Sequence, residues 1–222
     1  MLFAGLFLLE LLLLFLVSRQ VTRYLSFLFY RLTRNQTISI YSLALLFFPG
    51  TILHELSHLL MAGILFVPVG TMELFPKVEG DYVKLGSVQI AQTDIFRRFL
   101  IGAAPFLFGT SLLLGLLFFA AQNNLFSNYL YSALLAYAVF EIGNTMFSSR
   151  KDMEGAIELL GVVAFFGLVF YFVGFRLPAL NLESFFGSPI VMQVFQKGSL
   201  FLLIPLGIDI ILVGFLRLLN KR

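Results

Sequence analysis

His54 and His58 are the only two histidines in this 222-residue chain, and they lie four positions apart in the pattern His-Glu-x-x-His. On an α-helix, residues four apart differ by about 40° in direction, so both imidazoles would face one side. Two neutral imidazoles on one helix face can bind a single zinc ion. Glu55 lies beside His54, where its carboxylate could act on a water activated by that zinc. The pattern therefore predicts a zinc site with a general base next to it.

The composition around this pattern is that of a membrane protein. The chain is 59% hydrophobic and 12% charged, and the charged share is about half the usual 25%. These values exclude an ordinary soluble enzyme, a disordered chain and a nucleic-acid-binding protein. The motif alone occurs by chance in many sequences. However, an Asp, Lys or Arg at the centre of a membrane helix costs roughly 2.5–3.5 kcal/mol. Gathering a glutamate and both histidines in one turn of such a helix favours a functional metal site.

Six apolar stretches are long enough, or nearly long enough, for a membrane span of about 20 residues. They cover 1–17, 41–67, 99–121, 129–147, 156–175 and 199–216. The arginine-rich segment 18–40 predicts an interfacial helix. The alternating stretches 72–78 and 82–90, which flank Glu79-Gly80-Asp81, predict a β-hairpin. We therefore expect an all-α polytopic membrane protein of about six transmembrane helices, with a small membrane-associated β-hairpin after the His-Glu-x-x-His helix.

Catalytic zinc usually has three protein ligands, so a third ligand is needed. The chain has no cysteine, which leaves Asp or Glu. The candidates near membrane depth are Glu10, Glu141, Asp152, Glu154, Glu158 and Asp209. Asp152 lies in a polar break before an apolar helix, and such a break can present a carboxylate into a helix bundle. The alternative is that Asp152 or Ser149 simply caps this helix at the water boundary.

The arrangement of motifs resembles the site-2 protease family of intramembrane zinc metalloproteases. In that family an Asn-x-x-Pro-x-x-x-x-Asp-Gly pattern follows the histidine motif, and its Asp is the third zinc ligand. Asn144 and Asp152 have the same spacing, with Phe147 in place of the proline and Met153 in place of the glycine. The run Ala103-Ala104-Pro105 is similar to the family's Ala-Gly-Pro helix start. The polar hairpin is similar to its membrane-associated β-sheet.

The resemblance implies a zinc metalloendopeptidase in which His54, His58 and Asp152 hold Zn²⁺ and Glu55 is the general base. It also implies that Asn144 holds the substrate backbone or the oxyanion, the alternative being a hydrogen bond that only joins two helices. The implied partners are a membrane-protein or peptide substrate and the lipid bilayer, with no nucleic acid. We expect a multi-pass protein of a prokaryotic plasma membrane whose active site faces the cytosol.

The expected organisation has three parts. Residues 1–40 form an N-terminal membrane helix and basic interfacial segment, 41–175 form the metalloprotease core, and 176–222 form a loop and a C-terminal membrane helix. Two alternatives stay open. One is the other membrane zinc-protease family with this histidine motif, which uses a downstream glutamate ligand, here Glu154. The other is a non-catalytic metal-binding membrane protein, although the presence of Glu55 favours an enzyme.

Overall fold

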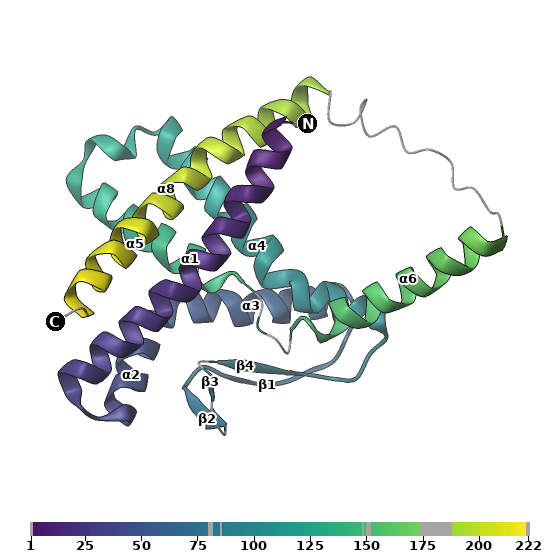
Figure 1. The fold of residues 1–222 in the computed structure, drawn as a ribbon, viewed down its shortest axis with the longest axis horizontal. Helices are drawn as coiled ribbons and strands as arrows, with labels where there is room; N and C mark the ends of the chain where they lie inside the picture. The colour runs from purple at the N-terminus through teal and green to yellow at the C-terminus, as the bar shows by residue number, and fades with distance from the viewer. Residues whose placement is uncertain are drawn as a thin grey trace.

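The computed structural model describes residues 2–79, 82–84, 86–147, 149, 152–173 and 188–220. The described chain is mostly helical, with two small two-stranded sheets that follow one another in a ribbon (Figure 1). Its elements in chain order are α1 (Leu2–Thr33), α2 (Gln36–Leu46), α3 (Phe48–Ile64), β1 (Val69–Glu73), β2 (Lys77–Glu79), β3 (Tyr82–Lys84), β4 (Ser87–Ile90), α4 (Ile95–Gln122), η1 (Leu125–Ser127), α5 (Tyr129–Thr145), α6 (Glu154–Val173) and α8 (Pro189–Asn220).

The N-terminal region differs from the expected membrane segment followed by a separate interfacial helix. α1 is one helix of 32 residues, about 48 Å long at 1.5 Å per residue. It contains no proline, and its arginines are good helix formers, so nothing stops the helix near residue 18. The chain turns only at Arg34, whose φ is 50°. Asn35 then caps α2 by accepting a hydrogen bond from the Ile38 N–H at 3.2 Å.

The second expected span is divided at Phe47. The axes of α2 and α3 differ by 68° across this break. Pro49 lies in the first turn of α3, where a residue without an N–H is tolerated, and it cannot continue the hydrogen-bond ladder of α2. The kink that Pro49-Gly50 makes possible is therefore present. As a result, the histidine motif lies in a separate helix of 17 residues.

Three helices, α1, α4 and α8, are long and apolar enough to cross a membrane, or four spans exist if the bent α2–α3 pair is one of them. Within the described part of the chain, α5 and α6 are not among them, so the expected count of about six is not confirmed. α8 is longer than predicted. It begins at Pro189, a favoured first helical residue, so 189–198 is helix rather than loop. The predicted end of the fifth stretch, at residue 175, lies outside the described residues.

The predicted hairpin is confirmed. β2 pairs antiparallel with β3, with Glu79 opposite Tyr82, and β1 pairs antiparallel with β4, with Val69 opposite Ile90. Gly80 and Asp81, expected at the turn, lie outside the described residues. The ribbon runs alongside α3, as Figure 1 shows.

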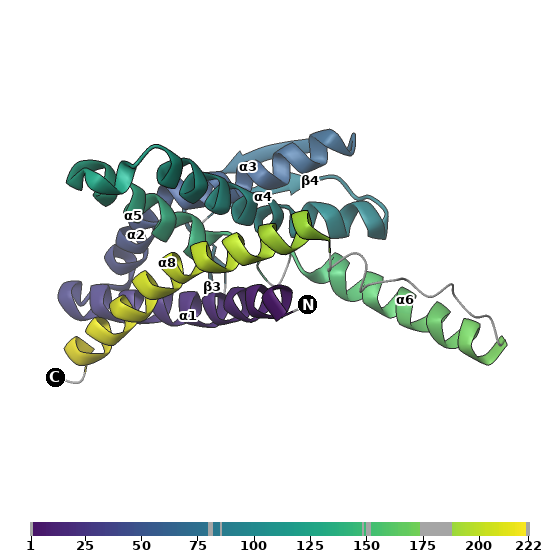
Figure 2. The same ribbon diagram turned by 90° about the horizontal axis from the view of Figure 1, so that it is seen from above.

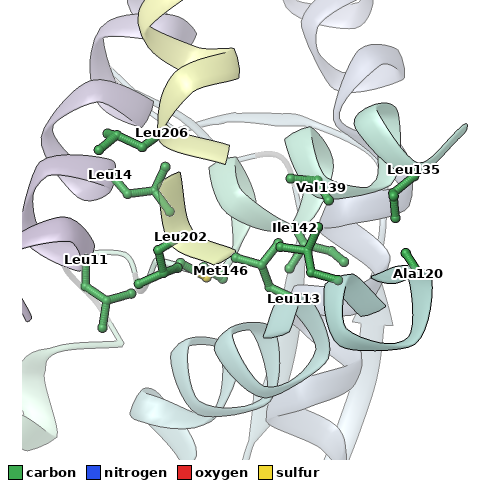
Figure 3. Close-up of a cluster of buried hydrophobic side chains, with 11 residues drawn as sticks. Leu11, Leu14, Leu113, Ala120, Leu135, Val139, Ile142, Met146, Leu202 and Leu206 are labelled. Atoms are coloured by element: carbon green, nitrogen blue, oxygen red, sulfur yellow. The ribbon is translucent and has the colours of Figure 1, made fainter. Parts of the chain in front are cut away.

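A leucine-rich core joins α1, α4, α5 and α8 (Figure 3). Its buried members are Leu11, Leu14, Leu113, Leu117, Ala120, Leu135, Val139, Ile142, Met146, Leu202 and Leu206. α1 and α8 lie side by side in both Figures 1 and 2, whereas α6 extends away from the bundle. The core fixes α4 and α5 against each other, and both of these helices contact α3, which carries the histidine motif.

Candidate metal centre

His54 and His58 on α3 converge with Asp152, which lies in the turn before α6. The two Nε2 atoms are 3.3 Å apart. Asp152 Oδ2 is 3.6 Å from His54 Nε2, and Asp152 Oδ1 is 3.4 Å from His58 Nε2. Ligands placed tetrahedrally at about 2.0–2.1 Å from a zinc ion are roughly 3.3 Å from one another. The three side chains therefore form a group that could hold one metal ion.

The outer nitrogen of each imidazole is held by a backbone carbonyl. His54 Nδ1–H donates to the Thr145 carbonyl at 2.6 Å, and His58 Nδ1–H donates to the Ile101 carbonyl at 2.8 Å. Because a carbonyl can only accept, the proton of each neutral ring must lie on Nδ1. Both Nε2 lone pairs then point toward each other and toward the Asp152 carboxylate. The lone pairs of the three groups converge on one point, as they do around a bound cation, and the outer hydrogen bond from Nδ1–H is typical of metal-bound histidine.

The Asp152 carboxylate takes part in two sets of contacts. Oδ2 accepts a hydrogen bond from the Ser149 N–H at 2.7 Å, and the Asp152 N–H donates to Ser149 Oγ at 3.3 Å. Burial by itself would raise the pKa of Asp152, but the two imidazoles that face the carboxylate and the hydrogen bond from the Ser149 N–H hold that pKa well below the usual range. The carboxylate therefore stays ionised. The carboxylate can bond to Ser149 within its own turn and still face both imidazoles.

Two glycines bring the Asp152 turn against α4. A Cβ at Gly102 would overlap the Asp152 carbonyl, and a Cβ at Gly155 would lie 2.8 Å from the Phe99 backbone nitrogen. The ion pair between Arg98 and Glu158, at 2.9 Å, joins the start of α6 to α4. α4 thus supports both His58, through the Ile101 carbonyl, and Asp152, through these close contacts. Sequence reasoning missed both glycines; the signal in each case was a glycine next to a predicted ligand or motif.

Glu55 is buried on α3, and the β-ribbon passes directly over it. A Cβ at Gly86 would lie 2.8 Å from Thr51 Cγ2 and 3.0 Å from Glu55 Oε1. A side chain at position 86 would require the Thr51 or Glu55 side chain to move. The position immediately before β4 is therefore in contact with the helix turn that carries the predicted general base.

The N-terminus of α3 is held from α5. No local side chain caps α3. Instead, the Gly50 N–H donates to Glu141 Oε2 at 2.9 Å, and Gly50 packs against Thr145 so closely that a Cβ would lie 2.9 Å from the Glu141 carbonyl oxygen. Glu141 is 1% exposed. α5 therefore supports the motif helix at two points, at Gly50 and at His54. Glu141, a candidate for the third ligand, instead accepts from the Gly50 N–H and is not part of the metal group.

The other predicted residues lie outside the metal group. Asn144 Nδ2 donates to Asp209 Oδ1 on α8 at 2.9 Å and to the Phe140 carbonyl at 2.9 Å. This is the hydrogen bond between helices that was one of two alternatives, and a contact of Asn144 with substrate stays a prediction. Glu154 is exposed in the first turn of α6 and is not part of the group. Glu10 accepts a hydrogen bond from Ser199 at 2.8 Å.

An apolar cavity of about 190 Å³ lies next to His54, between α3, α4 and α5. Its lining includes Leu53, Leu60, Phe108, Leu112, Ile142 and Met146, together with His54 and Thr145. The cavity therefore borders the metal centre through His54 and through Thr145, whose carbonyl accepts the His54 hydrogen bond.

Comparisons with protein-family models, with curated proteins and with solved structures give no match to this chain. The family resemblance therefore stays a prediction from the motifs.

Proposed function

We propose that this chain is an intramembrane zinc metalloprotease, which hydrolyses peptide bonds in or near the transmembrane segments of other membrane proteins. The observation that carries the proposal is the convergence of two histidine lone pairs and one ionised carboxylate at the spacing of tetrahedral ligands. Glu55 follows His54 directly, and three helices of membrane length lie in the same chain. These observations support a bound cation with a proton acceptor on the neighbouring residue of the same helix.

His54, His58 and Asp152 would hold the ion, and Glu55 would move the protons. Zinc, when bound, supplies a Lewis acid that activates water and polarises the carbonyl to be cut. Glu55 accepts a proton as the water oxygen forms a bond to the carbonyl carbon. The C–N bond then breaks, and Glu55 returns the proton to the leaving amine. Thr145 and Ile101 keep both imidazoles in the orientation that leaves Nε2 available.

The surroundings of the site favour an apolar, unwound substrate. The backbone of a membrane helix is already hydrogen-bonded within itself, so a segment must unwind before its peptide bond can be attacked. The ribbon β1–β4 offers strand edges to which such a segment could add. The cavity beside His54 suits an apolar side chain next to the bond being cut. Localisation in a prokaryotic plasma membrane, with the site toward the cytosol, belongs to the same proposal.

The test is zinc stoichiometry on the purified chain in detergent, for wild type and for His58→Ala, Asp152→Ala and Glu154→Ala. We expect about one zinc per chain in wild type, loss with His58→Ala and Asp152→Ala, and no change with Glu154→Ala. Glu154→Ala is the matched control because it removes a carboxylate two residues away. Loss of zinc through Glu154 alone would transfer the proposal to the glutamate-ligand family. Absence of zinc from wild type after reconstitution would overturn it.

Catalysis is tested separately with a model transmembrane substrate. Glu55→Gln should keep zinc and lower the cleavage rate by about 10²–10⁴-fold, the usual contribution of general acid–base catalysis. Zinc bound at full stoichiometry without cleavage of any membrane substrate would instead identify a non-catalytic metal-binding protein.

A further inference from the structure

The carbonyl that orients His58 is available because of a proline. In an α-helix the carbonyl of residue i accepts a hydrogen bond from the N–H of residue i+4. The residue four positions after Ile101 is Pro105, which has no N–H. α4 continues through Pro105 from Ile95 to Gln122. The Ile101 carbonyl therefore lacks its helical donor, and it accepts the His58 Nδ1–H at 2.8 Å instead.

The surroundings are buried, so water cannot easily take the place of the missing helical donor. Ile101 is 3% exposed, and the Pro105 side chain is fully buried. Water has little access to this part of the helix, and a buried carbonyl almost always has a donor. The imidazole N–H supplies the one that the proline removed. If residue 105 carried an N–H, that donor would share the Ile101 carbonyl with the imidazole, since a carbonyl oxygen has two lone pairs, and would weaken the bond to His58.

His54 is also bonded to a backbone carbonyl that has no helical N–H donor, but here the carbonyl lies at a helix end. Its acceptor, the Thr145 carbonyl, belongs to the last residue of α5. The N–H four positions later, at Ser149, donates to Asp152 Oδ2. Each imidazole thus binds a carbonyl without a helical donor, at a helix end for His54 and at a proline for His58.

We propose that Pro105 is a positioning residue for the metal centre. By removing the N–H that would compete for the Ile101 carbonyl, it holds His58 in the Nδ1–H tautomer, with Nε2 directed at His54 and Asp152. The consequence for metal binding rests on the proposed function, whereas the effect on the His58 tautomer does not.

Pro205 supplies a matched control. It too lies inside a long helix, α8, and its side chain is fully buried. Because both histidines of the chain lie on α3, replacement of Pro205 restores an N–H without affecting a histidine acceptor. A general effect of removing a buried helix proline would appear in both Pro105→Ala and Pro205→Ala. The proposed effect appears only in the first.

The experiment measures the tautomers of both histidines by nitrogen-15 NMR on the metal-free, full-length chain in detergent. The pH is kept well above the ordinary histidine pKa of about 6.5, so that the rings are neutral. We expect both wild-type rings to be protonated at Nδ1. Pro105→Ala should shift His58 toward the Nε2–H form and leave His54 unchanged, and Pro205→Ala should change neither. A wild-type His58 protonated at Nε2, or a Pro105→Ala spectrum identical to wild type, would overturn the proposal.

A backbone ester separates the N–H from the shape of the proline ring. Lactic acid at position 105 has the alanine side chain but no N–H, so it should return His58 to the Nδ1–H tautomer. If the ester behaves as Pro105→Ala does, ring shape is responsible and the proposal fails. Should Pro105→Ala not fold, this ester variant carries the test, because the proposal requires it to fold and to match the wild-type tautomer.

Metal affinity gives a second readout. Pro105→Ala should bind Co²⁺ about 10–100-fold more weakly than wild type, the range for losing an outer hydrogen bond to a ligating histidine. At the same time, its metal-free melting temperature should stay level or rise, because proline destabilises a helix interior. Full wild-type affinity in Pro105→Ala would contradict the metal part of the proposal. If wild type binds no metal, the proposed function fails while the tautomer result still decides the role of Pro105.

Discussion

Buried or half-buried carboxylates lie in two regions of this molecule, and their partners differ. In the metal centre, Asp152 faces two imidazole nitrogens whose lone pairs point at the same place. Between α1, α5 and α8, Glu10 and Asp209 each bond to one neutral side chain on a neighbouring helix. In each of these two, the second carboxylate oxygen has no partner among the described residues. The single hydrogen bonds of Glu10 and Asp209 join neighbouring helices. The convergence of several acceptors on one point, as at Asp152, is an arrangement that suits a cation.

The largest effect is expected when one acid is replaced in each region. Asp152→Asn should weaken zinc binding on the order of 100-fold or more, because losing a ligand exceeds the 10–100-fold effect of losing an outer partner. Asp209→Asn, which keeps an oxygen to accept from Asn144, should leave zinc affinity nearly unchanged. Both affinities can be measured by competition with a chelator. Equal losses in the two variants would mean that the regions act as one site.

Glu141 connects the two regions and gives the next largest effect. Glu141→Leu removes the acceptor for the Gly50 N–H at the start of α3, so we expect faster hydrogen exchange in the first turn of α3 and about tenfold weaker zinc binding. Glu10→Leu is the matched control, since Glu10 is also a buried acid with one hydrogen bond, but on α1. Exchange by mass spectrometry resolves the two helices. A larger change at α3 in Glu10→Leu would contradict the assignment.

The cavity beside His54 offers a test in which the metal should not change. Leu112→Trp places a larger side chain in the lining, so cleavage of substrates with large apolar side chains next to the cut bond should fall by roughly 10-fold. Zinc stoichiometry should stay at the wild-type value, because Leu112 lies on α4 and is not one of the three residues of the metal group. Substrates that carry alanine at that position serve as the internal control. A uniform loss for all substrates would show that the cavity does not select side chains.

An exposed carboxylate outside the membrane-spanning helices provides the smallest effect. Asp94 caps α4 by accepting the Arg97 N–H at 3.0 Å, and this bond lowers the pKa of Asp94. A lowered folded-state pKa means that the stabilisation is present above the unfolded value of about 3.9 and is lost as the pH falls through the folded value. Asp94→Ala should slightly lower the melting temperature at neutral pH and converge with wild type in acid. A difference that persists in acid would contradict this origin.

Much of the outline could be predicted from local patterns. Among the described residues, each of the long helices α1, α4, α5, α6 and α8 overlaps a predicted apolar stretch, although the ends of α1 and α8 differ. The alternation around residues 79–81 located the ribbon. Periodicity could not tell that α1 runs unbroken to Thr33, because arginines are compatible both with a helix interior and with an interface. It also could not give the angle at Phe47, since Pro49 permits a bend without specifying its size.

By itself, the sequence determined the motif turn on α3, the absence of any cysteine ligand, and the short list of acids from which a third ligand had to come. Helical geometry makes residues four apart share a face wherever the helix lies, so the pairing of His54 with His58 needed no tertiary information. Tertiary structure alone decided which acid meets the two imidazoles and which carbonyls hold them. Those partners come from segments some 40 to 100 positions away. Their approach depends on the close packing of Gly102 and Gly155 and on a carbonyl that Pro105 leaves without a helical donor, which no local pattern encodes.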